Sequence, residues 1–135
     1  IQAGWEMTGQ LLKKMRQVAD KINAPVVVML LPLALQVYPE MANDFLVENG
    51  LNRTDIELFK PQEMMKNIGE NIGIPIIDLY PVFRDTKAGC NCALYVQNDG
   101  HWNQLGHRIA AEEAATNLVR TGLMGPAMSM GKPSR

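Results

Sequence analysis

The chain has 135 residues, of which 47% are hydrophobic and 20% are charged, and its formal net charge at pH 7 is −1. This length fits one domain or part of one, with enough apolar residues for a packed core. The near-neutral charge and the lack of a long basic run argue against a nucleic-acid partner. No run approaches the roughly 18–20 apolar residues that span a bilayer, so no transmembrane segment is expected.

No signal peptide is visible, and the chain begins inside a helix-like pattern without an initiator Met, as expected for a processed product or a fragment. The first predicted element is an amphipathic helix over about 3–22, because apolar residues recur there at three- and four-residue steps. We expect its apolar face to pack in the core. That face comprises Trp5, Leu11, Leu12, Met15, Val18, Ala19 and Ile22.

A short, continuous apolar run follows at about 25–31 and is closed by Pro32. A strand that is apolar on both faces is typical of the middle of a parallel sheet covered by helices. The next segment has a weaker pattern, in which Pro39 can open a helix of about 40–48.

A second amphipathic helix is predicted over about 61–72, with Gly73 as its cap, and an apolar strand over about 74–80. Helix and strand thus alternate twice, which indicates an α/β protein. Asp78 is the polar position of this strand. It can reach a site at the strand's carboxyl end, but we favour a bond to the backbone or to a nearby side chain.

We expect a loop over residues 82–98, which contains both cysteines of the chain, Cys90 and Cys92. Cysteines one residue apart do not easily bridge each other, and structural zinc sites usually space them by two to four residues. We therefore favour two small, partly buried thiols and expect no metal. The alternative is a small metal-binding protein whose ligands are Cys90, Cys92, His101 and His107.

Both histidines of the chain fall within residues 99–107, which begin with Asp99-Gly100-His101. Asn98-Asp99-Gly100 is a turn sequence, Asn103 can cap a following helix, and the apolar pattern predicts that helix over about 104–120. An Asp beside a His can fix the imidazole tautomer and stabilise the imidazolium, as in a nucleophile–base–acid triad. The alternative is a simple turn residue beside an exposed loop histidine.

The segment from Leu94 to Asn103, continued by Leu105-Gly106-His107 and Ala110-Ala111-Glu112, resembles the C-terminal signature of SGNH hydrolases, also called GDSL-type esterases. In that family a closing Asp…His motif supplies the acid and base of a Ser-His-Asp triad. The resemblance implies that His101 is the general base and that Asp99 orients it. The commoner family spacing places two residues between Asp and His, and here only Gly100 lies between them.

The resemblance implies a partial flavodoxin-like, three-layer αβα fold, with the C-terminal part of the domain at 1–121 and a flexible tail at 122–135. It implies a serine esterase or acyl hydrolase that acts on a small-molecule or carbohydrate ester, such as an O-acetyl group, without a cofactor. Trp102, Asn103 and His107 are weaker candidates for the substrate pocket, and packing is the favoured role of His107.

The family's nucleophilic serine is missing from the pattern. The only serines are Ser129 and Ser134, both in the tail, and nothing resembles Gly-Asp-Ser. This chain is therefore expected to supply the His–Asp half of a triad and to be inactive alone. The alternative is a non-catalytic α/β binding or assembly module that retains the motif. Because two parallel strands make a poor sheet alone, we also expect either strands borrowed from another copy or an exposed apolar sheet edge. Self-association through that edge is the expected partner interaction.

Overall fold

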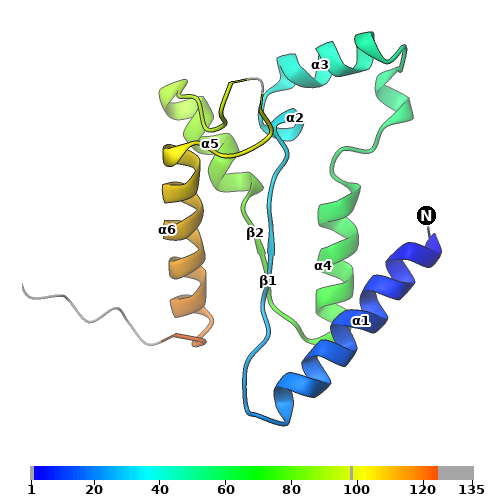
Figure 1. Cartoon of the computed structure of the whole chain (residues 1–135), viewed down its shortest axis with the longest axis vertical. Helices are drawn as coiled ribbons and strands as arrows, with labels where there is room; N and C mark the ends of the chain where they lie inside the picture. The colour runs from blue at the N-terminus through cyan, green and yellow to red at the C-terminus, as the bar shows by residue number, and fades with distance from the viewer. Residues whose placement is uncertain (1, 98, 125–135) are drawn as a thin grey trace, which may run out of the picture.

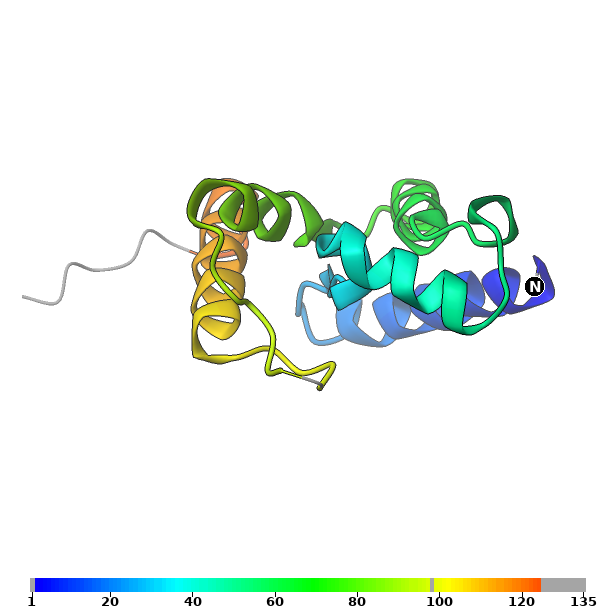
Figure 2. The same cartoon turned by 90° about the horizontal axis from the view of Figure 1, so that it is seen from above.

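A computed structural model describes residues 2–97 and 99–124. A small sheet lies between two groups of helices, with α1 and α4 on one side and α5 and α6 on the other (Figure 1, Figure 2). This confirms the expected partial α/β fold of SGNH type. Most of the predicted tail, including Ser129 and Ser134, lies outside the described residues.

The sheet consists of β1 (Val28–Leu30) and β2 (Ile76–Asp78), which pair in parallel with Val28 opposite Ile76. Both strands fall inside their predicted segments but are shorter, and Tyr80 already belongs to the next helix. The expected place in the middle of a covered sheet is wrong in the described part of the chain. Its sheet has two strands, so each strand is an edge, and Met29 is 40% exposed.

The first helical layer pairs α1 (Gln2–Asp20) with α4 (Lys60–Ile72), and both helices match their predicted ranges closely. The helix α4 lies on β2 because Gly69 permits a close approach: a Cβ at this position would lie 2.4 Å from Ile76 Cγ1. Gly73 ends α4 in the left-handed conformation, as its role as a cap predicts. The guanidinium of Arg16 donates to the carbonyl oxygen of Ile72 and joins the two helices.

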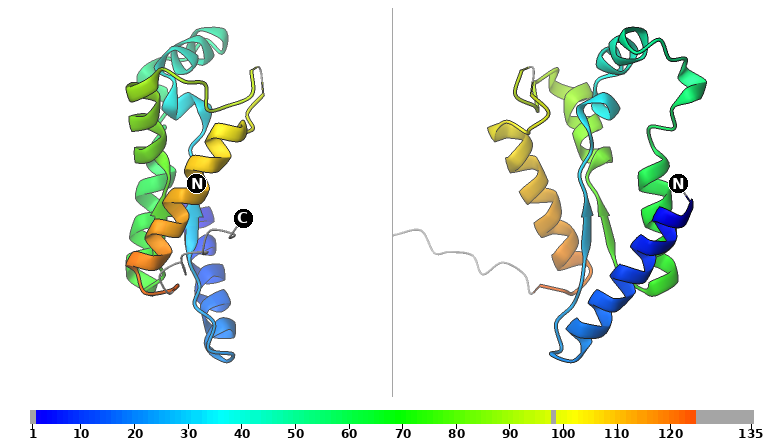
Figure 3. Two further views of the ribbon diagram at one scale, coloured as in Figure 1. Left: turned by 90° about the vertical axis from the view of Figure 1, so that its left-hand side faces the viewer. Right: turned by 45° about the vertical axis from the view of Figure 1, so that its right-hand side comes forward.

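The second layer contains α5 (Tyr80–Cys90) and α6 (Gln104–Arg120), which cross beside the sheet (Figure 3). Two shorter helices, α2 (Ala34–Val37) and α3 (Pro39–Glu48), follow β1, and a 3-10 turn, η1 (Arg53–Asp55), precedes α4. The main hydrophobic core joins α2, β2, α5, α6 and the segment before the Asp–His motif. Its buried residues are Ala34, Val37, Tyr38, Ile77, Leu79, Phe83, Leu94, Tyr95, Ile109 and Ala110.

The prediction of a loop over 82–98 is wrong for its first part, because α5 continues to Cys90. Pro81 lies in the first turn, where its fixed backbone angle favours a helix. Phe83 is fully buried in the core and anchors α5 there, although the polar composition of this helix is typical of a loop.

The expectation that the whole apolar face of α1 packs in the core is also wrong. Trp5 and Leu12 are half-buried, whereas Leu11 and Val18 are 55% and 63% exposed. The reason is geometric: α4 contacts one side of α1, and no further described strand extends the sheet beneath the other side.

Asp78 bonds to the backbone and to a nearby side chain, as we favoured from the sequence. Its Oδ1 accepts a 3.0 Å hydrogen bond from the backbone N–H of Tyr80, and its Oδ2 lies 2.8 Å from Lys66 Nζ. These contacts hold the end of β2 against α4 and the start of α5. Among the described residues, no helix combines the length and apolar character needed to cross a membrane.

Candidate active site

The Asp–His motif lies in the loop of residues 91–103 between α5 and α6, which we call the site loop. The loop lies near the ends of the strands where β1 leads into α2 (Figure 1). Tyr95 fixes this position, since its hydroxyl donates a 2.7 Å hydrogen bond to the carbonyl oxygen of Pro32, two residues after β1. Ligands of α/β proteins bind at this carboxyl edge of a parallel sheet.

Asp99 and His101 form a direct pair. Asp99 Oδ1 faces the Nδ1 atom of the His101 ring, and it also accepts a 2.9 Å hydrogen bond from the backbone N–H of His101. The backbone bond, followed by the contact with the ring, holds the pKa of the Asp99 carboxyl below its usual value. The imidazole side chain is 86% exposed, so its other nitrogen, Nε2, can be reached from outside.

The pair is mounted on a short antiparallel turn. Tyr95 and Trp102 form an isolated β-bridge, and the backbone N–H of Val96 donates to the carbonyl of His101 over 2.9 Å. These bonds close the loop on itself, so that Asp99 and His101 lie at the tip of a hairpin-like turn.

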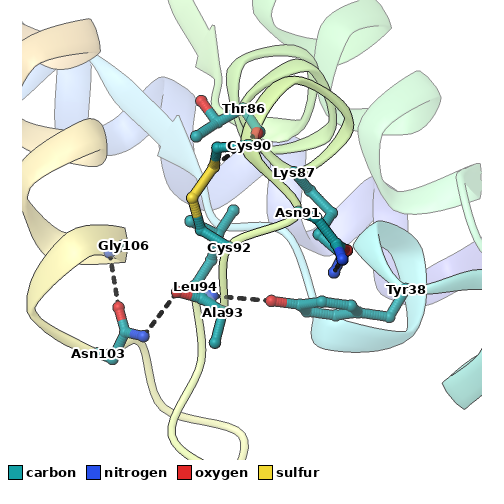
Figure 4. Close-up of a disulfide and its surroundings, with 10 residues drawn as sticks. All are labelled: Tyr38, Thr86, Lys87, Cys90, Asn91, Cys92, Ala93, Leu94, Asn103 and Gly106. Atoms are coloured by element: carbon teal, nitrogen blue, oxygen red, sulfur yellow. Dashed lines mark hydrogen bonds between the residues drawn. A yellow bond between two sulfur atoms is a disulfide. The ribbon is translucent and has the colours of Figure 1, made fainter.

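Asn103 fastens the turn to α6 and confirms its predicted role as helix cap. Its Oδ1 accepts a 3.0 Å hydrogen bond from Gly106 N–H, while its Nδ2 donates to the carbonyl of Ala93 over 2.8 Å (Figure 4). Gly106 is required by the close approach: a Cβ there would lie 2.4 Å from the carbonyl oxygen of Leu94. One side chain therefore links both ends of the site loop.

Trp102 packs against the core on one side and against the ring of His107 on the other. The Trp102 ring lies 5.0 Å from that of Phe83 and 5.6 Å from the His107 ring, which meets it edge-on at 74°. His107 itself is exposed, so the hydrogen-bonded packing role favoured for it stays a prediction. A role in a substrate pocket stays a prediction for Trp102, Asn103 and His107.

Two tyrosines that were not predicted from the sequence anchor the site loop to the rest of the fold. The hydroxyl of Tyr38 accepts a 2.8 Å hydrogen bond from the backbone N–H of Leu94, and the Tyr95 hydroxyl reaches Pro32. Burial raises the pKa of Tyr95 to about 12, so this phenol stays protonated and remains a donor at neutral pH. In the sequence, each is only a tyrosine near an apolar run. This pattern is too common to identify either one as an anchor of the loop.

Cys90 and Cys92 form a disulfide, with their Cα atoms 5.1 Å apart (Figure 4). The expectation of two thiols is therefore wrong, because the left-handed backbone of Asn91 brings the two sulfurs together. Bonded sulfurs are not thiolate ligands, so the set Cys90, Cys92, His101 and His107 does not form a metal site. In the part of the chain that the structure describes, no group of three or more His, Cys, Asp or Glu residues is placed to hold a metal ion.

A comparison with protein families gives a match over nearly the whole chain. A family model described as an SGNH hydrolase-like domain, acetyltransferase AlgX, matches residues 2–130. Neither the curated proteins nor the solved structures gave a significant match. The match agrees with the resemblance carried by the Asp–His segment, and it supports an acyl-related function of SGNH type. The chain therefore belongs to the family of SGNH hydrolase-like domains of the acetyltransferase AlgX type.

Proposed function

We propose that this chain supplies the His–Asp half of a Ser-His-Asp site that hydrolyses or transfers an acyl group held as an ester. The observation that carries the proposal is the direct pairing of Asp99 Oδ1 with His101 Nδ1 at the tip of a firmly anchored loop. In triads of this kind, the carboxylate orients the imidazole and the imidazole takes the proton of the nucleophile.

In this proposal each nitrogen of His101 has one task, and the contact of Nδ1 with Asp99 supports it. An imidazole that donates its Nδ1 proton to Asp99 leaves Nε2 as the acceptor, which is the state that a general base requires. His101 then returns the proton to the leaving alcohol, and Asp99 stabilises the imidazolium that forms between the two steps.

The electrostatics of Asp99 support this assignment. The backbone N–H and the ring of His101 lower the pKa of the carboxyl, so Asp99 is ionised at neutral pH and can balance the imidazolium charge. Because Asp99 is itself half-exposed, this pairing depends on the turn geometry rather than on exclusion of water.

The nucleophilic serine comes from outside the described residues, since the sequence has serine only at positions 129 and 134. A high exposure of the imidazole supports the same conclusion, because a working site needs further groups around Nε2 to place the substrate and exclude water. The family description names an acetyltransferase. We therefore propose acetyl as the acyl group, carried as an ester such as a carbohydrate O-acetyl, with water or a hydroxyl group as the acceptor.

The test is covalent labelling with a fluorophosphonate serine probe, read by intact mass. It is run on this chain and on the longest product obtainable from the native reading frame. The proposal predicts that only the longer product gains the label. Labelling of neither product would contradict the serine mechanism.

A substitution in the longer product tests the role of His101. His101→Ala should lower turnover of an acetyl ester by several orders of magnitude, because the serine loses its base. Gln97→Ala, an exposed position in the same loop, is the matched control and should retain turnover. A His101→Ala protein with most of its activity would remove His101 from the mechanism.

A second candidate is a binding module that retains the loop without catalysis, and the lack of a serine among the described residues favours it. Such a module should bind an acetylated carbohydrate without turnover, in titration calorimetry of the longer product. Fluorophosphonate labelling of that product excludes this candidate.

A further inference from the structure

We propose that the Cys90–Cys92 disulfide is a redox-sensitive positioning element for the site loop. In this proposal, a dithiol reductant that opens the bond loosens the Asp99–His101 turn and leaves the rest of the fold in place. The effect on catalysis rests on the proposed function, whereas the effect on the loop does not.

The disulfide lies where the chain leaves α5 and enters the site loop (Figure 4). Cys90 is the last residue of α5, and Asn91 has a φ of 49°, a left-handed conformation that side chains other than Gly adopt only uncommonly. Lys87 stabilises this turn through a 2.7 Å hydrogen bond from its Nζ to Asn91 Oδ1. The covalent bond therefore spans the position that sets the direction in which the loop departs.

The residues directly after Cys92 carry the anchors of the loop. Ala93 O accepts from Asn103 Nδ2 over 2.8 Å, Leu94 N–H donates to the Tyr38 hydroxyl over 2.8 Å, and Leu94 O accepts from Asn103 N–H over 3.0 Å. These bonds form only while the backbone of residues 93 and 94 stays in place beside Tyr38 and Asn103. A change in chain direction at Asn91 displaces the Ala93 carbonyl, the Leu94 N–H and the Leu94 carbonyl together.

A disulfide between residues only two positions apart does little for global stability. The loop-closure entropy that a cross-link removes from the unfolded chain grows with the length of the closed loop, and this loop is among the shortest. The bond therefore acts mainly on local geometry. This separates the proposal from the usual role of a disulfide as a brace for a whole domain.

The bond is accessible to thiol–disulfide exchange, because Cys90 is exposed and Cys92 is half-buried. A thiolate of a dithiol attacks Cys90 Sγ, forms a mixed disulfide and releases Cys92 as a thiolate, which takes up a proton. The second thiol of the reductant then displaces Cys90. The reductant leaves as a disulfide, and two electrons and two protons have passed to the cysteines.

The reduced state has a partner ready for one of the new thiols. Cys90 Sγ lies 3.1 Å from the carbonyl oxygen of Thr86, which can accept the S–H proton once the bond is open. The end of α5 can therefore hold the reduced side chain without rearrangement. Opening of the bond then frees the loop side of the turn rather than the helix side.

Amide hydrogen exchange of the 135-residue chain, followed by NMR, tests the positioning directly. The chain is compared in its oxidised form, after reduction with dithiothreitol, and as the Cys90→Ser/Cys92→Ser variant. The reporters are the amides of Leu94 and Asn103. The controls are the amides of Val28 and Leu79, whose hydrogen bonds link the chain segments of β1 and β2. Reduction and the double substitution should each accelerate the reporters by about tenfold or more and the controls by less than about twofold.

Unchanged reporters, or equal acceleration at all four amides, would overturn the proposal, and so would two free thiols in air-oxidised protein by mass spectrometry. The functional part uses the rate of fluorophosphonate labelling of the longer product. This rate should fall on reduction, return on reoxidation, and become insensitive to dithiothreitol in the double variant. A longer product that never takes the label contradicts the proposed function alone, since the exchange data still decide the positioning.

Discussion

At the scale of single residues, the pKa of Asp99 depends on the backbone N–H and the imidazole ring of His101. The hydrogen bond from the backbone N–H of His101 makes the largest single contribution to the low pKa of Asp99, and the imidazole lowers this pKa further. We therefore predict that His101→Ala leaves the pKa of Asp99 below 3.8, though higher than in the unsubstituted chain. A titration of the Asp99 side-chain carboxyl carbon by NMR measures both values.

The sign of the pH dependence follows from this lowered pKa. A carboxyl whose pKa is lower in the folded state adds stability above its unfolded pKa and loses it as the pH falls through the folded pKa. The Asp99 turn should therefore persist from neutral pH down to below pH 3.8 and open under stronger acid. If His101→Ala returns the pKa of Asp99 fully to its usual value, the ring rather than the backbone holds the turn.

At the scale of elements, the junction between α6 and the site loop requires a glycine. A Cβ on Gly106 would lie 2.4 Å from the Leu94 carbonyl oxygen and 3.0 Å from Trp102 Cβ. We predict that Gly106→Ala lowers the free energy of unfolding by about 1–3 kcal/mol, because the backbone of the loop must move away. Urea unfolding at 25 °C measures the difference.

Gly89 is the matched control, since it is also helical and a Cβ there meets nothing within 4 Å. Gly89→Ala should raise the free energy of unfolding by up to about 1 kcal/mol through helix propensity alone. Opposite signs for the two substitutions would show that the contact with Leu94, and not the helix itself, decides the outcome. A stabilising Gly106→Ala would mean that the loop can shift without cost.

The elements with strong local signals were predictable from the sequence. α6 was placed correctly because Asn103 marks its start and its apolar residues keep a helical period. The contact between Asp99 and His101 was predictable because both residues lie within three positions of sequence. In contrast, α5 was missed because its polar composition resembles a loop, and a single buried ring, Phe83, fixes it in the core.

Other parts of the site depend on contacts between distant segments. Tyr38 reaches Leu94 across 56 residues, and Tyr95 reaches Pro32 across 63. No local pattern encodes such pairs, because each requires the folded arrangement of β1, α2 and the site loop. The disulfide was missed for a different reason: the left-handed conformation of Asn91 lets two cysteines bridge at a spacing that usually prevents it.

At the scale of the whole molecule, an apolar surface is left uncovered beside the sheet. The outer face of α1, formed by Met7, Leu11, Met15 and Val18, and Ile22 in the turn after the helix are more than half exposed at every position. Part of this face lines a shallow depression that extends to Val26, just before β1. Met29 on β1 is also 40% exposed, at an edge of the two-stranded sheet. Exposed apolar surface of this extent marks an interaction site or a tendency to aggregate.

We predict that the chain alone self-associates through the outer face of α1. Light scattering coupled to size exclusion should give an average mass above 15.0 kDa that rises with concentration. The triple variant Leu11→Gln/Met15→Gln/Val18→Gln should return to the mass of one chain. Its stability should change little, because these side chains are already largely in water in the single chain.

Leu12→Gln separates association from stability in the same helix. Leu12 is half-buried and belongs to the stripe with Trp5 and Arg16, which faces α4. This substitution should lower the free energy of unfolding by about 1–3 kcal/mol, because a polar group enters the contact between α1 and α4. It should leave the association of the folded protein unchanged, since the outer face is intact. A wild-type chain that keeps a mass of 15.0 kDa at every concentration would show that the exposed face does not drive self-association.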